Sequence, residues 1–139
     1  MTILVVDGQG GGLGRSLVEK LRQAALPIAI MAVGTNVGAT TAMLRAGADA
    51  AATGENAVIY NAAQADIITG GAGILCANAM MGEISPAMSA AISGSNAIKL
   101  LIPFPQSRLR MCGTPDLPLP ERIDQAVREI AQVIAEING

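Results

Sequence analysis

Histidine is absent from this 139-residue chain, and aromatic side chains are nearly absent. Without histidine the chain lacks the most common general base and a frequent metal ligand, so any catalysis would depend on carboxylates, Arg, Lys, Cys or Ser, and we expect no metal site. Tyr60 and Phe104 are the two aromatic residues, which leaves almost no platform for the stacking of bases. The composition therefore argues against nucleic acid as a partner.

Charge is also scarce. Charged residues make up 14% of the chain, the net charge is −2, and the cationic residues are scattered instead of forming a basic stripe. This distribution again disfavours nucleic acid. A small domain with so few charges has a more apolar surface than most monomers, so we expect a homodimer or a larger homo-oligomer.

Two long uncharged stretches, 23–44 and 67–82, are interrupted by proline, asparagine or glycine, so neither is typical of a membrane span. The apolar residues 3–6 have the pattern of a core strand and not of a signal sequence. These features predict a cytoplasmic protein with no membrane partner. With 51% hydrophobic residues and no linker, residues 1–139 are expected to form a single domain.

Strand-like and helix-like patterns alternate along the whole chain, which is typical of an α/β domain. Strands are predicted at 3–6, 28–33, 50–52, 66–69, 97–102 and 109–112. Helices are predicted at 13–25, 38–46, 53–61, 85–92 and 119–137, whereas 74–81 fits either a helix or a loop. We therefore expect a doubly wound, mainly parallel, Rossmann-like sheet of five or six strands in the order 3-2-1-4-5, with the sixth strand after the fifth.

A glycine-rich turn, Asp7-Gly-Gln-Gly-Gly-Gly-Leu-Gly14, lies between the first strand and an amphipathic helix. Such a turn allows backbone N–H groups to approach a phosphate, and the helix N-terminus adds partial positive charge. In the predicted fold, this turn meets a second glycine-rich turn after the fourth strand, at the crevice where the strand order reverses. The sequence therefore predicts a small, phosphate-containing ligand. Asp7 would repel a phosphate, so we expect its carboxylate to accept N–H groups of the loop.

The spacing of Gly8, Gly12 and Gly14 resembles the cofactor loop of short-chain dehydrogenases, which implies NAD or NADP. The acidic residue that NAD enzymes carry after the second strand is missing, because Thr35 and Asn36 stand there. These two could bind a ribose or a phosphate, or they could form a turn and cap the next helix. The catalytic Tyr-Lys pair of that family is also missing, since Gln64 follows Tyr60 by four residues. We expect Tyr60 to lie at the edge of the core.

Glu83 is the candidate catalytic residue, because it is the one carboxylate in a long uncharged stretch and burial could raise its pKa toward a general acid or base role. It could equally support the N-terminus of the helix that Ser85 and Pro86 begin. Arg108 and Arg110 could contact an anion or a second subunit, but the default expectation is that both side chains lie on the solvated surface. The predicted cofactor-binding residues are Gly8, Gln9, Gly10, Gly11, Gly12, Leu13, Gly14, Thr35, Asn36, Gly70, Gly71, Gly73 and Asn78.

Several longer motifs together resemble a small bacterial family, domain of unknown function number 3842. They are DGQGGGLGRSLVEKL, VGTN, AML-x-AGAD, ATGENAV, ANAMMGEISPAM and KLLIPF, and they extend over nearly the full chain. The resemblance implies a Rossmann-like, nucleotide-binding-type fold without an established activity.

Two functional interpretations follow from the sequence. The first is a protein that binds a nucleotide or dinucleotide through its glycine-rich loop, as a sensor or as an enzyme. The second is a noncatalytic, oligomeric interaction protein in which the glycine loops are architectural. The sequence does not decide whether the protein is an enzyme.

Overall fold

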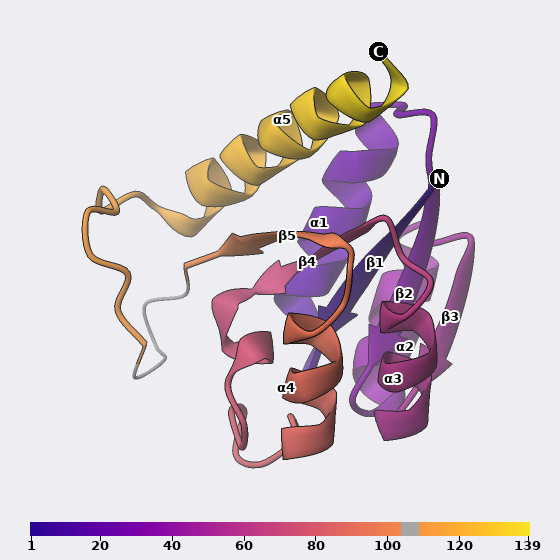
Figure 1. Cartoon of the computed structure of the whole chain (residues 1–139), viewed down its shortest axis with the longest axis vertical. Coiled ribbons are helices and arrows are strands. Elements are labelled where there is room, and N and C mark those ends of the chain that lie inside the picture. The colour runs from indigo at the N-terminus through magenta and orange to yellow at the C-terminus, as the bar shows by residue number, and fades with distance from the viewer. Residues whose placement is uncertain (104–108) are drawn as a thin grey trace.

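The computed structural model describes residues 1–103 and 109–139, and one parallel sheet forms its centre (Figure 1). Five strands pair in the order β3-β2-β1-β4-β5, as the sequence predicts, and every pairing is parallel. The strands are β1 (Thr2–Asp7), β2 (Ala29–Gly34), β3 (Ala50–Thr53), β4 (Ile67–Gly71) and β5 (Ile98–Ile102).

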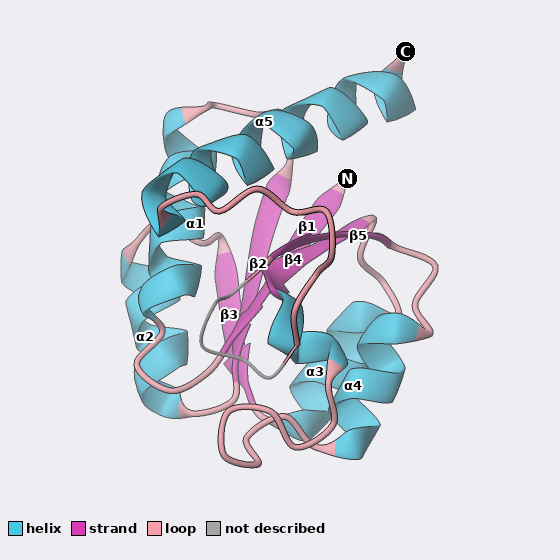
Figure 2. Ribbon diagram, turned by 90° about the vertical axis from the view of Figure 1, so that its left-hand side faces the viewer, coloured by secondary structure: helices cyan, strands magenta, loops and turns pink. Residues whose placement is uncertain are grey.

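Helices cover both faces of the sheet, which makes the fold doubly wound (Figure 2). On one face lie α1 (Gly12–Gln23), α2 (Val37–Arg45) and α5 (Leu119–Asn138). On the other face lie α3 (Glu55–Ala62) and α4 (Pro86–Ser93), together with the short 3₁₀ helix η1 (Ala72–Leu75) that follows β4. None of the helices in the described ranges is long and apolar enough to cross a membrane.

The central strand β1 explains why the apolar run at the start of the chain is continuous. Ile3 and Val5 pack with α1 and α5 on one face, whereas Leu4 and Val6 pack with α3 and α4 on the other. All four side chains are fully buried. A strand covered on both faces has no polar side, so its sequence does not alternate.

The sixth strand, expected at 109–112, is not formed, and these residues are irregular and exposed. The chain turns within this segment, because the Thr114 N–H donates to the Met111 carbonyl at 3.3 Å and Gly113 has a left-handed φ of 81°. The guanidinium of Arg122 instead holds the approach to α5 by donating to the carbonyls of Leu117 and Pro115. Arg110 is exposed, and Arg108 lies outside the described residues.

Thr69 in β4 carries a buried hydroxyl without a hydrogen-bond partner among the described residues. A buried polar group without a partner destabilises the folded state. We expect Thr69→Val to raise the free energy of unfolding by about 1 kcal/mol, because valine has nearly the same shape and no hydroxyl. Urea denaturation measures the difference.

Thr40 provides the matched control for this substitution. Its hydroxyl lies 2.6 Å from the hydroxyl of Thr53 and 3.1 and 3.2 Å from the carbonyls of Asn36 and Ala52, either of which can accept its proton. Thr40→Val should therefore lower the stability while Thr69→Val raises it. Loss of stability in both variants would show that the Thr69 hydroxyl has a stabilising partner.

Candidate functional site

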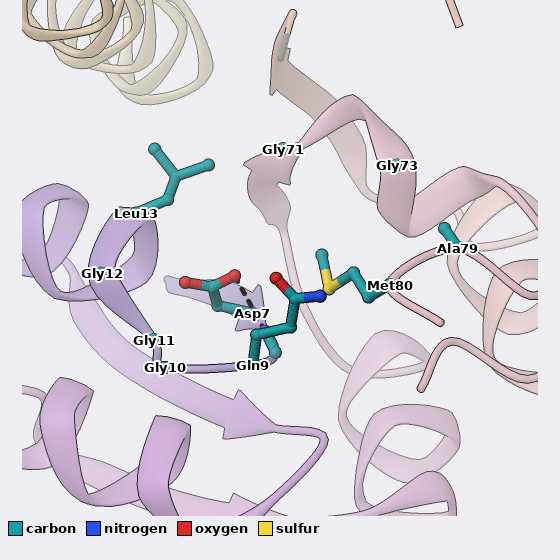
Figure 3. Close-up of a pocket in the computed structure, with 11 residues that line it drawn as sticks. Asp7, Gln9, Gly10, Gly11, Gly12, Leu13, Gly71, Gly73, Ala79 and Met80 are labelled. Carbon is teal, nitrogen blue, oxygen red and sulfur yellow. Dashed lines mark hydrogen bonds between the residues drawn. The ribbon is translucent and has the colours of Figure 1, made fainter. Parts of the chain in front are cut away.

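A pocket of about 350 Å³ opens at the carboxyl ends of β1 and β4, where the strand order reverses (Figure 3). One wall is the loop between β1 and α1 with the first turn of α1. The facing wall is the end of β4 with the turns that follow it. The lining residues are Asp7, Gly8, Gln9, Gly10, Gly11, Gly12, Leu13, Gly71, Gly73, Ala79 and Met80.

The loop from Gly8 to Gly11 is a tight turn closed by a hydrogen bond from the Gly11 N–H to the Gly8 carbonyl at 2.9 Å. Gln9 and Gly11 adopt left-handed backbone conformations, with φ of 49° and 74°. At Gly11 a side chain is excluded for a second reason, because a Cβ would lie 2.8 Å from the Cα of Ala39 in α2. Glycine at this position is therefore needed to bring α1 and α2 together.

The carboxylate of Asp7 holds the loop from below, as the sequence predicts. Its Oδ1 accepts the Gly8 N–H at 2.8 Å, and its Oδ2 accepts the Gly14 N–H at 2.6 Å. The residue is 6% exposed. Burial raises the pKa of Asp7 above its ordinary value; the two N–H donors act in the opposite direction, and the carboxylate of Glu83 adds to the rise. Asp7 is thus a buried organiser of the turn.

Gly12 and Leu13, in the first turn of α1, line the pocket, and their N–H groups have no hydrogen-bond acceptor among residues 1–103 and 109–139. Gly11 caps this helix without a side-chain hydrogen bond, and the helix itself offers no acceptor to the N–H groups of Gly12 and Leu13. A Cβ at Gly10 or Gly12 would meet no atom within 4 Å. These two glycines therefore leave space open where N–H groups and the positive end of the helix dipole are available.

Glu83 connects three loops through one oxygen. Its Oε1 accepts the Thr35 hydroxyl at 2.5 Å, the Gln9 N–H at 2.9 Å and the Asn36 amide at 2.9 Å. The Thr35 hydroxyl holds the pKa of Glu83 below its ordinary value, and the other two donors act in the same direction. The expectation that burial raises this pKa is therefore wrong, because Glu83 is half-buried and well supplied with donors.

Thr35 and Asn36 do not line the pocket. Asn36 caps α2, since its Oδ1 accepts the Ala39 N–H at 2.9 Å, so the capping interpretation is confirmed for this residue. Its amide nitrogen also donates to the carbonyl of Gln9 at 2.9 Å, in addition to Glu83. Both polar side chains after β2 are thus occupied by contacts within the protein.

Three more predicted residues lie outside the lining of the pocket. Gly14 lies against Asp7 and Met43, and a Cβ there would be 2.6–3.0 Å from their side chains. Gly70 lies against β1, where a Cβ would be 2.5 Å from the carbonyl of Val6. Asn78 is an exposed turn residue with a φ of 68°.

Ala79 and Met80 line the pocket, although neither was expected from the sequence. In Figure 3 the side chains of Gln9 and Met80 point toward each other across the opening. The segment 76–84 is a series of turns and not a helix. Non-glycine φ values of 58° at Met80 and 57° at Met81 aim these side chains in directions that no helical or strand periodicity reveals.

Tyr60 lies on α3 and is 62% exposed, so it is a surface residue and not the expected edge of the core. Cys76 and Cys112 are free, and Cys112 is exposed. In the described part of the chain, no three His, Cys, Asp or Glu side chains gather as the ligands of a metal ion would.

Comparisons with known proteins agree with this architecture. A family model described as "Domain of unknown function (DUF3842)" matches residues 2–135. Among solved structures, the chain is similar to a dodecameric FMN-dependent UbiX-like decarboxylase from Escherichia coli O157:H7, with a TM-score of 0.50 and 14% identity over 97% of this chain and 94% of that chain. At this identity the similarity concerns the fold. No match was found among curated proteins.

Proposed function

The chain belongs to the family described as a domain of unknown function (DUF3842), and we infer its function from the site. We propose that the pocket binds a nucleotide-type ligand through a phosphate group. One observation carries the proposal: the space above Gly10 and Gly12 is open where α1 begins. An anion in this space can accept N–H groups that have no acceptor within the helix.

The dimensions of the pocket support a small organic ligand. Its volume of about 350 Å³ lies near the lower end of the roughly 300–1,000 Å³ that is usual for small-molecule sites. Leu13, Ala79 and Met80 supply apolar contacts, and the glycines supply backbone polar groups. A ligand with a charged end and a flat or apolar end matches this lining, as a nucleotide does.

The charges near the pocket are compatible with a phosphate. Glu83 directs one oxygen to Gln9, Thr35 and Asn36, so the donors that surround this carboxylate offset part of its charge. Asp7 has a raised pKa and shares its oxygens with two loop N–H groups. We propose that both carboxylates position the loops and that Glu83 is not a general acid, since its lowered pKa keeps it ionised at neutral pH.

FMN is the first ligand to test, because the structurally similar decarboxylase is FMN-dependent. NAD and NADP follow, because the spacing of Gly8, Gly12 and Gly14 resembles that of a dinucleotide loop. The fold similarity supports nucleotide-type ligands as a class.

Thermal unfolding and isothermal titration with FMN, NAD, NADP, ATP and inorganic phosphate test the proposal. A ligand at one hundred times its Kd should stabilise the folded protein by about 2.7 kcal/mol. We expect a saturable response to at least one nucleotide and a weaker one to phosphate. A folded protein that responds to none of these ligands would overturn the proposal.

A noncatalytic interaction protein is the second candidate function. Large apolar side chains are exposed at Met81, Val37 and Tyr60, which are 97%, 70% and 62% accessible. The similar decarboxylase is dodecameric, and we propose that this chain also associates with copies of itself. Absence of ligand binding, together with a mass in solution that is a multiple of 14.1 kDa, would favour this second function.

A further inference from the structure

The crevice is closed on the side of β2. In doubly wound folds that bind dinucleotides, the ligand extends across the crevice and one ribose lies at the end of the second strand. Here the polar side chains at that end, Thr35 and Asn36, both donate to Oε1 of Glu83, which belongs to the segment between β4 and α4. A side chain from the opposite half of the sheet thus takes the contacts that a ribose would use.

The space above Gly8 is also filled. A Cβ at this residue would lie 2.6 Å from the Thr35 Oγ1, 2.7 Å from the Met80 Sδ and 3.1 Å from the Glu83 Oε1. Gly8 is accordingly buried. A ligand that continued from the loop toward β2 would have to displace these three side chains.

The open part of the site lies on the other side of the loop. From Gly10 and Gly12 the pocket continues toward Gly71, Gly73 and Ala79, beside the end of β4 (Figure 3). A phosphate at the start of α1 can therefore connect to the rest of its ligand in one direction, toward β4. The opposite direction leads to the hydrogen bonds of Glu83.

We propose that the site selects nucleotides whose phosphate is terminal, and that Glu83 excludes dinucleotides by occupying the position of their second nucleoside. This inference rests on the proposed nucleotide binding. Glu83 is a positioning residue in this scheme: it holds Gln9, Thr35 and Asn36 together and does not contact the phosphate. Mononucleotides such as FMN and nicotinamide mononucleotide are the expected class, and FAD and NAD are the excluded one.

Two matched pairs of ligands test the selection, FMN against FAD and nicotinamide mononucleotide against NAD. Within each pair the base is the same, and the larger member carries an adenylate on the phosphate. Titration of the wild-type chain should give at least tenfold tighter binding of the mononucleotide in the pair that binds. Equal or tighter binding of the dinucleotide would overturn the inference while leaving nucleotide binding intact. If no member of either pair binds and ATP also fails, the proposed function itself is wrong.

Two substitutions then test the role of Glu83. Glu83→Gln keeps an acceptor oxygen and should keep the preference for the mononucleotide. Glu83→Ala removes the acceptor for Gln9, Thr35 and Asn36 and should reduce the preference to less than threefold, mainly through tighter binding of the dinucleotide. An unchanged preference in a folded Glu83→Ala variant would refute this role. If that variant does not fold, the proposed selection is judged from the binding of the two ligand pairs by the wild type and by Glu83→Gln.

Discussion

Gly14→Ala should lower the free energy of unfolding by about 2–4 kcal/mol, from overpacking together with a damaged hydrogen bond. The added Cβ would lie 2.6 Å from the Met43 Sδ, 2.8 Å from the Asp7 Cβ and 3.0 Å from its Oδ2. The methionine can change its rotamer, but the Asp7 Cβ is fixed by β1. Asp7 would have to retreat, which weakens its bond to the Gly14 N–H. Urea denaturation measures the loss.

Gly12→Ala is the matched control, because the residue lies in the same helical turn and its Cβ would meet nothing within 4 Å. We expect a change smaller than about 0.5 kcal/mol, or a slight gain, since alanine favours the helix more than glycine does. Equal losses in the two variants would show that the contact with Asp7 is not the cause of the destabilisation.

Gly12→Asp should weaken the proposed nucleotide binding by at least about a hundredfold, or about 2.7 kcal/mol. The new carboxylate would occupy the open space at the start of α1 and repel a phosphate there. The fold should remain stable, because an added Cβ would meet no atom within 4 Å and an acidic residue is favourable in the first turn of a helix. Isothermal titration with FMN, together with thermal unfolding of the free protein, separates the two effects.

Ala87→Asp provides a control with the same charge in the first turn of another helix. Ala87 is exposed in the first turn of α4 and is not among the residues that line the pocket. Its substitution should leave the affinity unchanged within about twofold. A change of this size corresponds to much less than the roughly 1.4 kcal/mol of a tenfold change in Kd. Similar weakening by Ala87→Asp and Gly12→Asp would point to a general effect of charge. Unchanged binding in Gly12→Asp would show that the phosphate does not bind at this loop.

The fold and the glycine side of the pocket could be predicted because their signals are local. A continuous apolar run indicates a strand covered on both faces, and the glycines that follow it mark a turn into α1. The strand order follows from general rules of doubly wound sheets. For the same reason, the sequence places Gly8 to Gly14 next to Gly70 to Gly73. In the structure Gly8 to Leu13 line the pocket with Gly71 and Gly73, whereas Gly14 and Gly70 lie outside its lining.

The network around Glu83 could not be predicted, because its partners are distant in sequence. Gln9 and Glu83 are separated by 74 residues, and Thr35 and Glu83 by 48. Their meeting depends on the irregular path of 76–84, where left-handed residues such as Met80 break every periodic pattern. A lone carboxylate in an uncharged stretch suggested burial. The sequence marked Gln9, Thr35 and Asn36 as ligand-binding candidates, but nothing in it indicated that they donate to Glu83.

The glycines of the loop fall under two different kinds of evolutionary constraint. At Gly8, Gly11 and Gly14, a larger residue collides with the protein itself, so selection for a stable fold is enough to retain them. At Gly10 and Gly12, nothing in the fold opposes a side chain. Under the proposed function, relatives that do not bind the ligand should therefore accumulate substitutions at these two positions first, and relatives that bind it should keep both glycines.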